Sequence, residues 1–572
     1  MIVLFENYKY KKNDVTSLVP EWMLRTTDNT DTVVLPYVGY FFSREANDSV
    51  FFLPKIFVDE NGLAFGCRPP EDLTHSIGLS SLKNTMLSSH LYSLSMWIYE
   101  SLKVYRDTNS DTDIKLTEAD SVKNLISYKR GTATHTMMEI YFSFIEFNKN
   151  NRNVFLRRKY AADKGHKIKW HRTVNRIQPV IQDGVPIYTE HKTVVNRINY
   201  EEELLILYYS VINYFRQNFG YLIYADDNYE LIKGKKFTDL LGGKALRKLR
   251  HIKNNYFSDV FVKMWNLLYQ FFDFYSTINI SDDYEEVLIT DNYPMVFESM
   301  IDTLIGDKPG KDGLKKFYAD QKDGKRVDHI YRDSDLFSDD SIYFIGDSKY
   351  YRTGSLAKGE SVEKQFTYAK NIIQYNTDPY SVCGRKARYR DELTEGYNIT
   401  PNFFISALVN NEYDASKDSI KNLGTPEFSC QFKDRLFDRD TLVVHRYSIN
   451  FLFVLSAYIS KDGIMRESFR KKVRKEFRTD IIRYLNERYV MFRVFPNASV
   501  TCEDIIADNF RKLCGKMFSL KNDKSFFIVA YDRDYMWESG YRTVESRVLQ
   551  LKNELLTMKG VSAVSNFTLP ED

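Results

Sequence analysis

The sequence predicts a multidomain protein of the α/β and α+β classes. Residues 1–70 contain short aromatic and β-branched runs bounded by Asp, Asn and Gly, which is typical of strands. Residues 201–290 show helical spacing of apolar side chains, and from Asp291 strand and helix signals mix. A chain of 572 residues is long enough for several domains. We expect four: an N-terminal β and helical domain that binds DNA or a partner (1–150), a basic hairpin and helical domain (151–290), an α/β domain (291–460), and a basic, helical C-terminal α/β extension (461–572).

The composition excludes several classes of protein. Hydrophobic residues make up 43% of the chain and aromatic residues 15%, which excludes a disordered chain. The five cysteines are scattered without a C-x-x-C pair, so a disulfide framework is not indicated and a reduced, cytoplasmic location is favoured. The apolar run Ile449–Ile459 is interrupted by Asn450 and Ser456 and is too short to cross a bilayer. We expect a buried strand there and no membrane contact.

The charges nearly cancel over the whole chain but not along it. Eighty Lys and Arg stand against 77 Asp and Glu, a formal charge of +3. Basic residues gather at 149–176, 244–253 and 466–478. Nucleic-acid binding therefore requires these clusters rather than an overall excess of positive charge.

The first basic cluster leaves two interpretations open. In one, its cations follow DNA phosphates while an aromatic ring stacks on a base. In the other, the cations are solvated and the aromatic rings belong to the core. The candidate DNA contacts are Arg157, Arg158, Lys169, Trp170 and Arg172. After this cluster, Asp183-Gly184 predicts a hairpin turn.

The segment that starts at Asp291 predicts a helix with a carboxylate at the edge of its apolar face. Asp291 or Asn292 can cap the helix, and Gly306 suits its end. The apolar stripe has the spacing i, i+3, i+4 and i+7. It consists of Phe297, Met300, Ile301 and Leu304, with Glu298 beside it.

Two strands follow this helix and carry further charged side chains. Residues 325–332 predict a strand that contains Asp328, and residues 333–340, DSDLFSDD, predict a hairpin loop. Residues 341–350 predict the second strand. Since residues i and i+2 of a strand share one face, Asp347 and Lys349 point the same way. His329 points away from Asp328 and is not expected to bind a metal.

This order of acids favours metal-dependent cleavage of a phosphodiester bond. Mg²⁺ is held by one or two carboxylates plus water and substrate phosphate, and Mn²⁺ is a possible substitute. We expect Asp328 and Asp347 to share one metal ion. Glu298 would bind a second metal ion or a metal-bound water. Lys349 would hold the attacking water or stabilise the negative charge of the transition state.

The set Glu298, Asp328 and Asp347-Ser-Lys349 resembles the PD-(D/E)xK nuclease superfamily. The resemblance implies a restriction-endonuclease-like αβββαβ core. The next helix, SVEKQFTYAKNIIQY, is similar to the Q-x-x-x-Y helix of McrC-like and RecB-like nucleases. Here Gln365 and Tyr368 are three residues apart instead of four. The resemblance therefore implies a role beside the active site or on DNA for Gln365, and leaves Tyr368 without one.

Other segments are similar to LlaJI-type restriction endonucleases, which are relatives of McrC. They are LPYVGYFFS, DSVFFLPKIFV and KIKWHRTVNRIQPVIQDGVPIYTE. The resemblance implies the double-stranded-DNA-cutting subunit of a bacterial restriction system, an antiviral defence. A separate McrB-like AAA+ GTPase would be its motor.

The sequence agrees with a motor on another chain. It contains no G-x-x-x-x-G-K-[ST], because Ala245 of LLGGKALRK replaces the Ser or Thr. Double-strand cutting needs two active sites, so a working dimer is possible.

Next to a nuclease, the third basic cluster favours DNA contact. On a helix, Arg470, Arg474 and Arg478 share one face at i, i+4 and i+8.

Two other functions remain open. One is a repair or recombination nuclease that acts on branched DNA with the same active site. The other is a non-catalytic DNA-binding or adaptor subunit with a relic nuclease fold, although relic domains tend to lose at least one of the four active-site residues that are present here.

Overall fold

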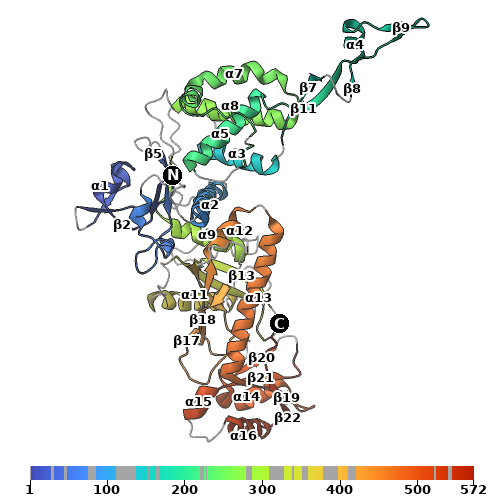
Figure 1. The fold of residues 1–572 in the computed structure, drawn as a ribbon. Helices are drawn as coiled ribbons and strands as arrows, with labels where there is room; N and C mark the ends of the chain where they lie inside the picture. Colours follow the sequence, from blue (N-terminus) through green and yellow to red (C-terminus); the bar gives the residue numbers. More distant parts are fainter. Residues whose placement is uncertain are drawn as a thin grey trace.

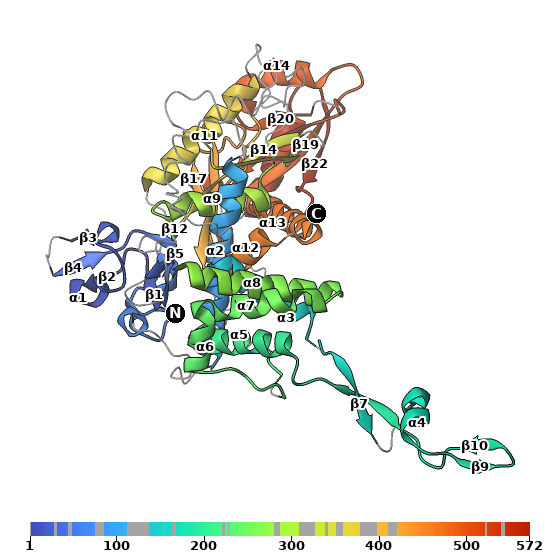
Figure 2. The ribbon, with the colours of Figure 1, turned by 90° about the horizontal axis from the view of Figure 1, so that it is seen from above.

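In a computed structural model, the chain forms an N-terminal, a central and a C-terminal region (Figures 1 and 2). An arm projects from the helices of the N-terminal region. The residues that the structure describes are 2–27, 31–43, 48–74, 85–110, 137–152, 154–162, 167–219, 224–226, 228–278, 287–307, 327–337, 341–350, 359–377, 397–409, 420–460, 462–520, 523–538 and 544–571.

The N-terminal region is built on a four-stranded sheet. Its order is β1 (Ile2–Phe5), β6 (Asp48–Leu53), β5 (Val38–Ser43) and β12 (Val287–Thr290). Strand β1 runs parallel to β6, whereas β5 is antiparallel to both of its neighbours. A second small sheet has the order β2 (Lys9–Lys11), β4 (Thr32–Val34) and β3 (Arg25–Thr26), and the short helix α1 is Lys12–Val15.

Strand β12 closes the N-terminal sheet from a distant part of the chain. Its pairing places Ile289 opposite Gly39 of β5. A Cβ on Gly39 would lie 2.1 Å from the Leu288 carbonyl oxygen, so this approach requires glycine. The proposed boundary at residue 290 therefore falls directly after a strand of the N-terminal sheet.

A layer of helices follows the N-terminal sheet. Aromatic side chains dominate its packing: the rings of Phe144 and Phe215 lie 5.3 Å apart, and Phe271 contacts both. The helices are α2 (Thr85–Ser110), α3 (Met137–Asn150), α5 (Glu203–Phe219), α6 (Lys235–Asp239), α7 (Ala245–Ile252) and α8 (Asp259–Ile278).

An arm projects from this helical layer (Figures 1 and 2). Its tip is the predicted hairpin, in which Asp183 and Gly184 take positive φ values of 52° and 78° between two antiparallel strands. The hairpin prediction is confirmed. The arm consists of β7 (Arg157–Ala162), β8 (Lys167–Ile168), α4 (Trp170–Arg176), β9 (Val180–Gln182), β10 (Val185–Ile187) and β11 (Thr193–Ile198).

The central region contains a mixed sheet. Strands β13 and β14 are antiparallel, whereas β14, β15 and β18 run parallel. The sheet order is β13 (His329–Ser334), β14 (Ser341–Lys349), β15 (Asn402–Leu408), β18 (Leu442–Asn450) and β16 (Ile420–Asn422), with β17 (Glu427–Ser429) also paired to β18.

Helices cover both faces of this sheet. Phe403 packs on Phe477 of α13 (Gly463–Arg488), and the next residue, Phe404, clusters with Val362 of α11 (Gly359–Thr377). Since successive strand residues face opposite sides, α11 and α13 lie on opposite faces. Helix α9 (Tyr293–Ile305) packs on α13 and on strands β13 and β14.

The predicted αβββαβ core stays a prediction, because the described residues cover only part of this segment. Their order is α9-β13-β14-α11-β15, with two strands between the helices. Residues 308–326 lie outside the described residues. The first strand begins at His329, later than predicted, so Asp328 directly precedes it, and Lys325 and Arg326 are not described. The second strand, predicted over 341–350, is confirmed over Ser341–Lys349. Of the predicted loop, residues 338–340 are also not described.

The expected strand over Ile449–Ile459 is wrong. Strand β18 ends at Asn450, and α12 occupies Phe451–Ile459. The Asn450 side chain accepts a hydrogen bond from the Leu452 amide and caps the helix. A short apolar run fits a buried strand or a buried helix equally well, and here the cap decides.

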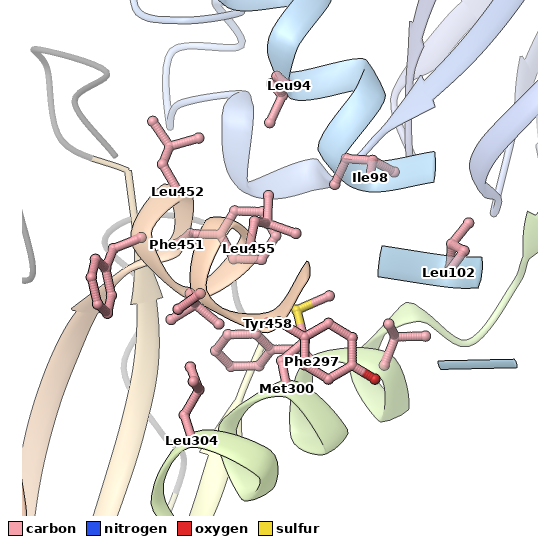
Figure 3. Close-up of a cluster of buried hydrophobic side chains, with 14 of the residues drawn as sticks. Leu94, Ile98, Leu102, Phe297, Met300, Leu304, Phe451, Leu452, Leu455 and Tyr458 are labelled. Carbon is pink, nitrogen blue, oxygen red and sulfur yellow. The ribbon is translucent and has the colours of Figure 1, made fainter. Parts of the chain in front are cut away.

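Helix α12 joins the N-terminal and central regions. Figure 3 shows its side chains packed between those of α2 and α9. Helix α12 contacts both neighbours, and the side chains are buried. The residues at this junction include Leu94, Ile98 and Leu102 of α2, Phe297, Met300 and Leu304 of α9, and Phe451, Leu452, Leu455 and Tyr458 of α12.

The C-terminal region is an antiparallel sheet with helices, joined to the centre by α13. The sheet order is β20 (Met517–Ser519), β21 (Phe527–Asp532), β19 (Tyr489–Pro496) and β22 (Val561–Phe567). Its helices are α14 (Cys502–Leu513), α15 (Arg533–Glu538) and α16 (Val544–Leu556). Within the described part of the chain, no helix is long and apolar enough to span a membrane.

Candidate active site

The β13–β14 hairpin brings two of the predicted acids together. His329 pairs with Gly346, so one step further along the two antiparallel chains Asp328 lies opposite Asp347. The two carboxyl groups share a hydrogen bond. The Ser348 amide also donates to Asp328 Oδ2 at 3.4 Å, a long contact.

Lys349 lies on the same face as Asp347, as predicted. Its ammonium forms an ion pair with Asp347 Oδ2, and both side chains are largely buried, with 17% and 12% exposed. The ammonium also lies 5.4 Å from the centre of the Phe404 ring on the neighbouring strand. The carboxylate of Asp347 is therefore held between a cation and a second carboxyl group.

Burial and negative charge keep the Asp328 carboxyl protonated in the metal-free protein. Burial is the largest cause of its raised pKa, followed by the hydrogen bond and charge of Asp347 and by the charge of Glu298. Lys349 acts in the opposite direction. Together these interactions raise the pKa of Asp328 to about 10. At neutral pH, one proton therefore lies between Asp328 and Asp347.

Glu298 acts on this pair from helix α9. Its charge contributes to the raised pKa of Asp328, which shows that the helix presents it towards the site. Among the described residues, no group of three or more His, Cys, Asp and Glu side chains is arranged to hold a metal ion. A ligand role for Glu298 therefore stays a prediction.

Helix α11 contributes Gln365 and Tyr368. Gln365 is fully buried, and its amide nitrogen and oxygen have no hydrogen-bond partner among the described residues. Burial and the charges of Asp328 and Asp347 raise the pKa of Tyr368, so the Tyr368 hydroxyl interacts electrostatically with the two carboxyl groups.

The sequence reasoning left Tyr368 without a role because its spacing from Gln365 is three. Positions i and i+3 of a helix nevertheless lie on the same side, and this periodicity was the available signal.

His329 is buried, and its side chain lies on the face of the hairpin opposite the carboxyl pair. Its Nε2 lies 2.5 Å from the Ser348 hydroxyl, and its Nδ1 lies 3.5 Å from Asp302 Oδ1. Ser348 separates Asp347 from Lys349 in sequence, so His329 connects the active-site strand to α9.

The three arginines predicted on one face of α13 are bonded within the protein. Arg470 donates to the Thr303 carbonyl at 2.9 Å, and Arg478 donates to the carbonyls of Ser334 and Asp335. Arg474 binds the Ile305 carbonyl through Nε and Nη2 at 3.0 and 2.6 Å.

The shared face of these arginines is thus confirmed, and it packs against α9 and the end of β13. DNA contact by Arg470, Arg474 and Arg478 stays a prediction.

The predicted DNA contacts on the arm are accessible. Trp170 is 55% exposed, which contradicts a core role for this ring. It contacts Tyr188 and His191 edge-on. Arg157, Arg158, Lys169 and Arg172 are all exposed. DNA contact by these five residues stays a prediction.

Comparison with known proteins places the chain in a family. The sequence model of the LlaJI restriction endonuclease family matches residues 83–381, slightly more than half of the chain. The chain belongs to this family. The matched range includes the arm, α9, the β13–β14 hairpin and all of α11.

The other comparisons give no further information about the fold or the function of the chain. No curated protein matches the sequence. A chain from an assembly of Thermococcus gammatolerans McrB AAA+ hexamers with bound McrC aligns with 83% of this chain and 99% of its own length, at 12% identity and a TM-score of 0.27. At that score the likeness supports no argument about fold or function.

Proposed function

We propose that this member of the LlaJI restriction endonuclease family is a Mg²⁺-dependent DNA endonuclease of the PD-(D/E)xK type. The observation that carries the proposal is the contact of Asp347 and Lys349 on β14 with Asp328, which directly precedes the neighbouring strand β13. Two adjoining carboxyl groups can hold a divalent cation, and a lysine beside them can stabilise the negative charge that develops when a phosphodiester bond is hydrolysed. Family membership supplies the class of reaction.

The donor set fits Mg²⁺ or Mn²⁺. Asp328 and Asp347 offer oxygen ligands, which hard cations prefer, and the nearby His329 imidazole is bonded to Ser348 instead. Mg²⁺ keeps several waters and is usually held by one or two carboxylates, so a pair is sufficient. A cation at this position would replace the proton that the pair shares and would supply charge neutralisation and an activated water.

The remaining groups would act on the substrate. The ion pair with Asp347 holds the Lys349 ammonium where it can stabilise negative charge on the phosphate or orient the attacking water. Glu298 adds negative charge from α9 and would accept a proton or a hydrogen bond from a water in the site. Tyr368 would donate a hydrogen bond from α11.

The proposal includes partners. Double-stranded DNA is the substrate, and the exposed cations and Trp170 of the arm are the proposed contacts. We also propose that a separate McrB-like AAA+ GTPase acts as the motor. The absence of a phosphate-binding loop from the printed sequence supports this division of labour. A dimer would supply the two active sites that cut both strands.

A plasmid cleavage assay tests this function. We expect the full chain to cut supercoiled plasmid with Mg²⁺ or Mn²⁺ but not with EDTA, and to cut faster with the AAA+ GTPase encoded beside it. Lys349→Ala should lower the cleavage rate by about 10²–10³-fold, because it removes a preorganised charge from the transition state.

The matched control is Lys364→Ala, which removes an exposed lysine from α11. DNA retention by the Lys349 variant separates loss of chemistry from loss of binding. If Lys349→Ala cuts as fast as the parent protein, Lys349 has no catalytic role. A parent protein that retains DNA but never cuts it would favour an adaptor subunit.

A further inference from the structure

Helix α7 presents a basic face that the proposed active site and arm do not use. Its buried side is apolar and packs on α8. The buried residues are Ala245, Leu246, Leu249 and Ile252. The opposite side is exposed and cationic. The exposed residues are Lys244, Arg247, Lys248, Arg250, His251 and Lys253.

Few negative charges oppose this face. No Asp or Glu occurs from Leu240 to Ser258 in the sequence. Lys244 forms an exposed ion pair with Asp239 at 2.8 Å, and the charge of Asp273 acts on Arg250. Within the described residues, Arg247 and Lys248 take part in no ion pair. The cations of α7 therefore remain largely uncompensated.

Aromatic rings lie beside these cations. The Lys253 ammonium lies 4.9 Å from the centre of the Trp265 ring, and Arg250 donates to the Tyr269 hydroxyl at 3.0 Å. Phe257 is 88% exposed, although it directly follows the buried Tyr256. Phe257 follows Lys253 by four residues, so an exposed aromatic ring comes shortly after the cations of this segment in the chain.

We propose that the surface formed by α7 and Phe257 binds nucleic acid, with the cations on phosphates and Phe257 on a base or sugar. Proteins that hold single-stranded nucleic acid combine positive charge with exposed aromatic rings in this way. This site deepens the proposed nuclease function and rests on it, since it places a second contact for the DNA substrate in the helical region, apart from the arm.

The dimensions of α7 suit a phosphate backbone. Eight residues at about 1.5 Å each give a helix about 12 Å long. Phosphates of one strand follow at about 3.4 Å along the duplex axis, so α7 can face three or four of them. Arg247 and Lys248 lie on the exposed side near the middle of this length and are the first residues to test.

The experiment measures DNA affinity of the full chain by fluorescence anisotropy, with single-stranded and double-stranded oligonucleotides, over a roughly sixfold range of salt from about 50 to 300 mM. Removal of two phosphate contacts by Arg247→Ala/Lys248→Ala should reduce the slope of log K against log salt by about 1.5–2 and weaken binding about tenfold or more at low salt. Phe257→Ala should weaken single-strand binding severalfold and leave the slope unchanged.

Helix α14 offers matched controls of the same residue types. Arg511 and Lys512 are an exposed Arg-Lys pair, and Phe510 beside them is 38% exposed. Arg511→Ala/Lys512→Ala and Phe510→Ala should leave affinity and salt slope at the parent values.

The outcomes separate the two proposals. If the parent binds and cuts DNA while the α7 variants match it in affinity and slope, the α7 site is wrong and the nuclease function stands. If the α7 variants bind DNA weakly as predicted but the parent cuts nothing, the α7 site stands and the nuclease function fails. An equal loss in the α7 and α14 variants would also overturn the α7 site, since it would show a general charge effect.

Discussion

At the scale of single residues, the site depends on one proton that two carboxyl groups share. Asp328 and Asp347 cannot both be charged at close range in a buried position without compensation, and Lys349 compensates one of them. A divalent cation would compensate both. The metal-free protein therefore stores an unfavourable interaction at the place where the proposed metal ion binds.

This interaction predicts a pH dependence of stability. An unfolded chain releases the Asp328 proton near pH 4, whereas the folded protein keeps it up to about pH 10. Between these values the unfolded state binds fewer protons at this group, so the contribution of Asp328 to the free energy of unfolding falls as pH rises. Asp328→Asn removes this titration. In EDTA, urea unfolding from pH 5 to 9 should show the variant gaining stability relative to the parent as pH rises.

Asp333→Asn, which changes an aspartate within β13, is the control and should follow the parent at every pH. A constant difference between Asp328→Asn and the parent from pH 5 to 9 would mean that Asp328 is already ionised in the folded protein.

At the scale of elements, the helix and strand that carry the site, α9 and β14, were predicted more accurately than α12. The helix over α9 and strand β14 are confirmed, because their apolar patterns are long and their ends carry clear signals. The apolar stripe of α9, from Phe297 to Leu304, is fully buried as expected. The placement of α12 failed because Asn450, which looks like an interruption of a buried strand, is the cap at the start of a helix.

Contacts between distant segments escaped prediction for a different reason. Strand β12 joins β5 across more than 240 residues, and no local pattern encodes such a partner. The same applies to Arg474, whose helical face was predicted but whose partner was not. From sequence, an arginine that caps another helix looks the same as one that binds phosphate.

Arg474 tests that distinction. It is 14% exposed, binds the last carbonyl of α9 and Asp307, and lies 4.2 Å from the centre of the Tyr331 ring. Arg474→Ala should lower the free energy of unfolding by about 2–3 kcal/mol, because a charged hydrogen-bond donor to the carbonyl of the buried Ile305 and to the partly exposed Asp307 is lost. Chemical denaturation measures the change, and DNA affinity should not change in protein that remains folded.

Lys475→Ala removes an exposed cation from the same helix and should leave stability within about 0.5 kcal/mol of the parent. Weak DNA binding by folded Arg474→Ala, with stability unchanged, would support the DNA-contact prediction for this arginine.

At the scale of the whole molecule, a buried hydrogen bond joins the N-terminal region to the central region. Glu6, which follows β1 and is 3% exposed, accepts a hydrogen bond from the Tyr350 hydroxyl at 2.5 Å and another from the Lys55 amide at 3.1 Å. Tyr350 directly follows Lys349, and its ring packs on Phe297 of α9. The first strand of the chain is thus in contact with the end of the active-site strand.

Tyr350→Phe tests how strongly this contact joins the two regions. The loss of the hydroxyl leaves the buried Glu6 carboxylate with one donor fewer, so we expect a loss of about 1–3 kcal/mol in the free energy of unfolding. Tyr8→Phe is the matched control, because Tyr8 also donates to a glutamate, Glu71, but in a more exposed position. Equal losses in urea denaturation of the two variants would argue against a special contribution from the Glu6–Tyr350 bond.

DNA cleavage at the site formed by Asp328, Asp347 and Lys349 is the activity proposed for this protein. The most direct test is single-turnover cleavage of supercoiled plasmid in Mg²⁺ by the parent, Asp347→Asn and the control Asp333→Asn. We predict that Asp347→Asn lowers the cleavage rate at least about 100-fold while DNA binding persists, and that Asp333→Asn cuts like the parent. Cleavage by Asp347→Asn at the parent rate would show that Asp347 is not part of the active site.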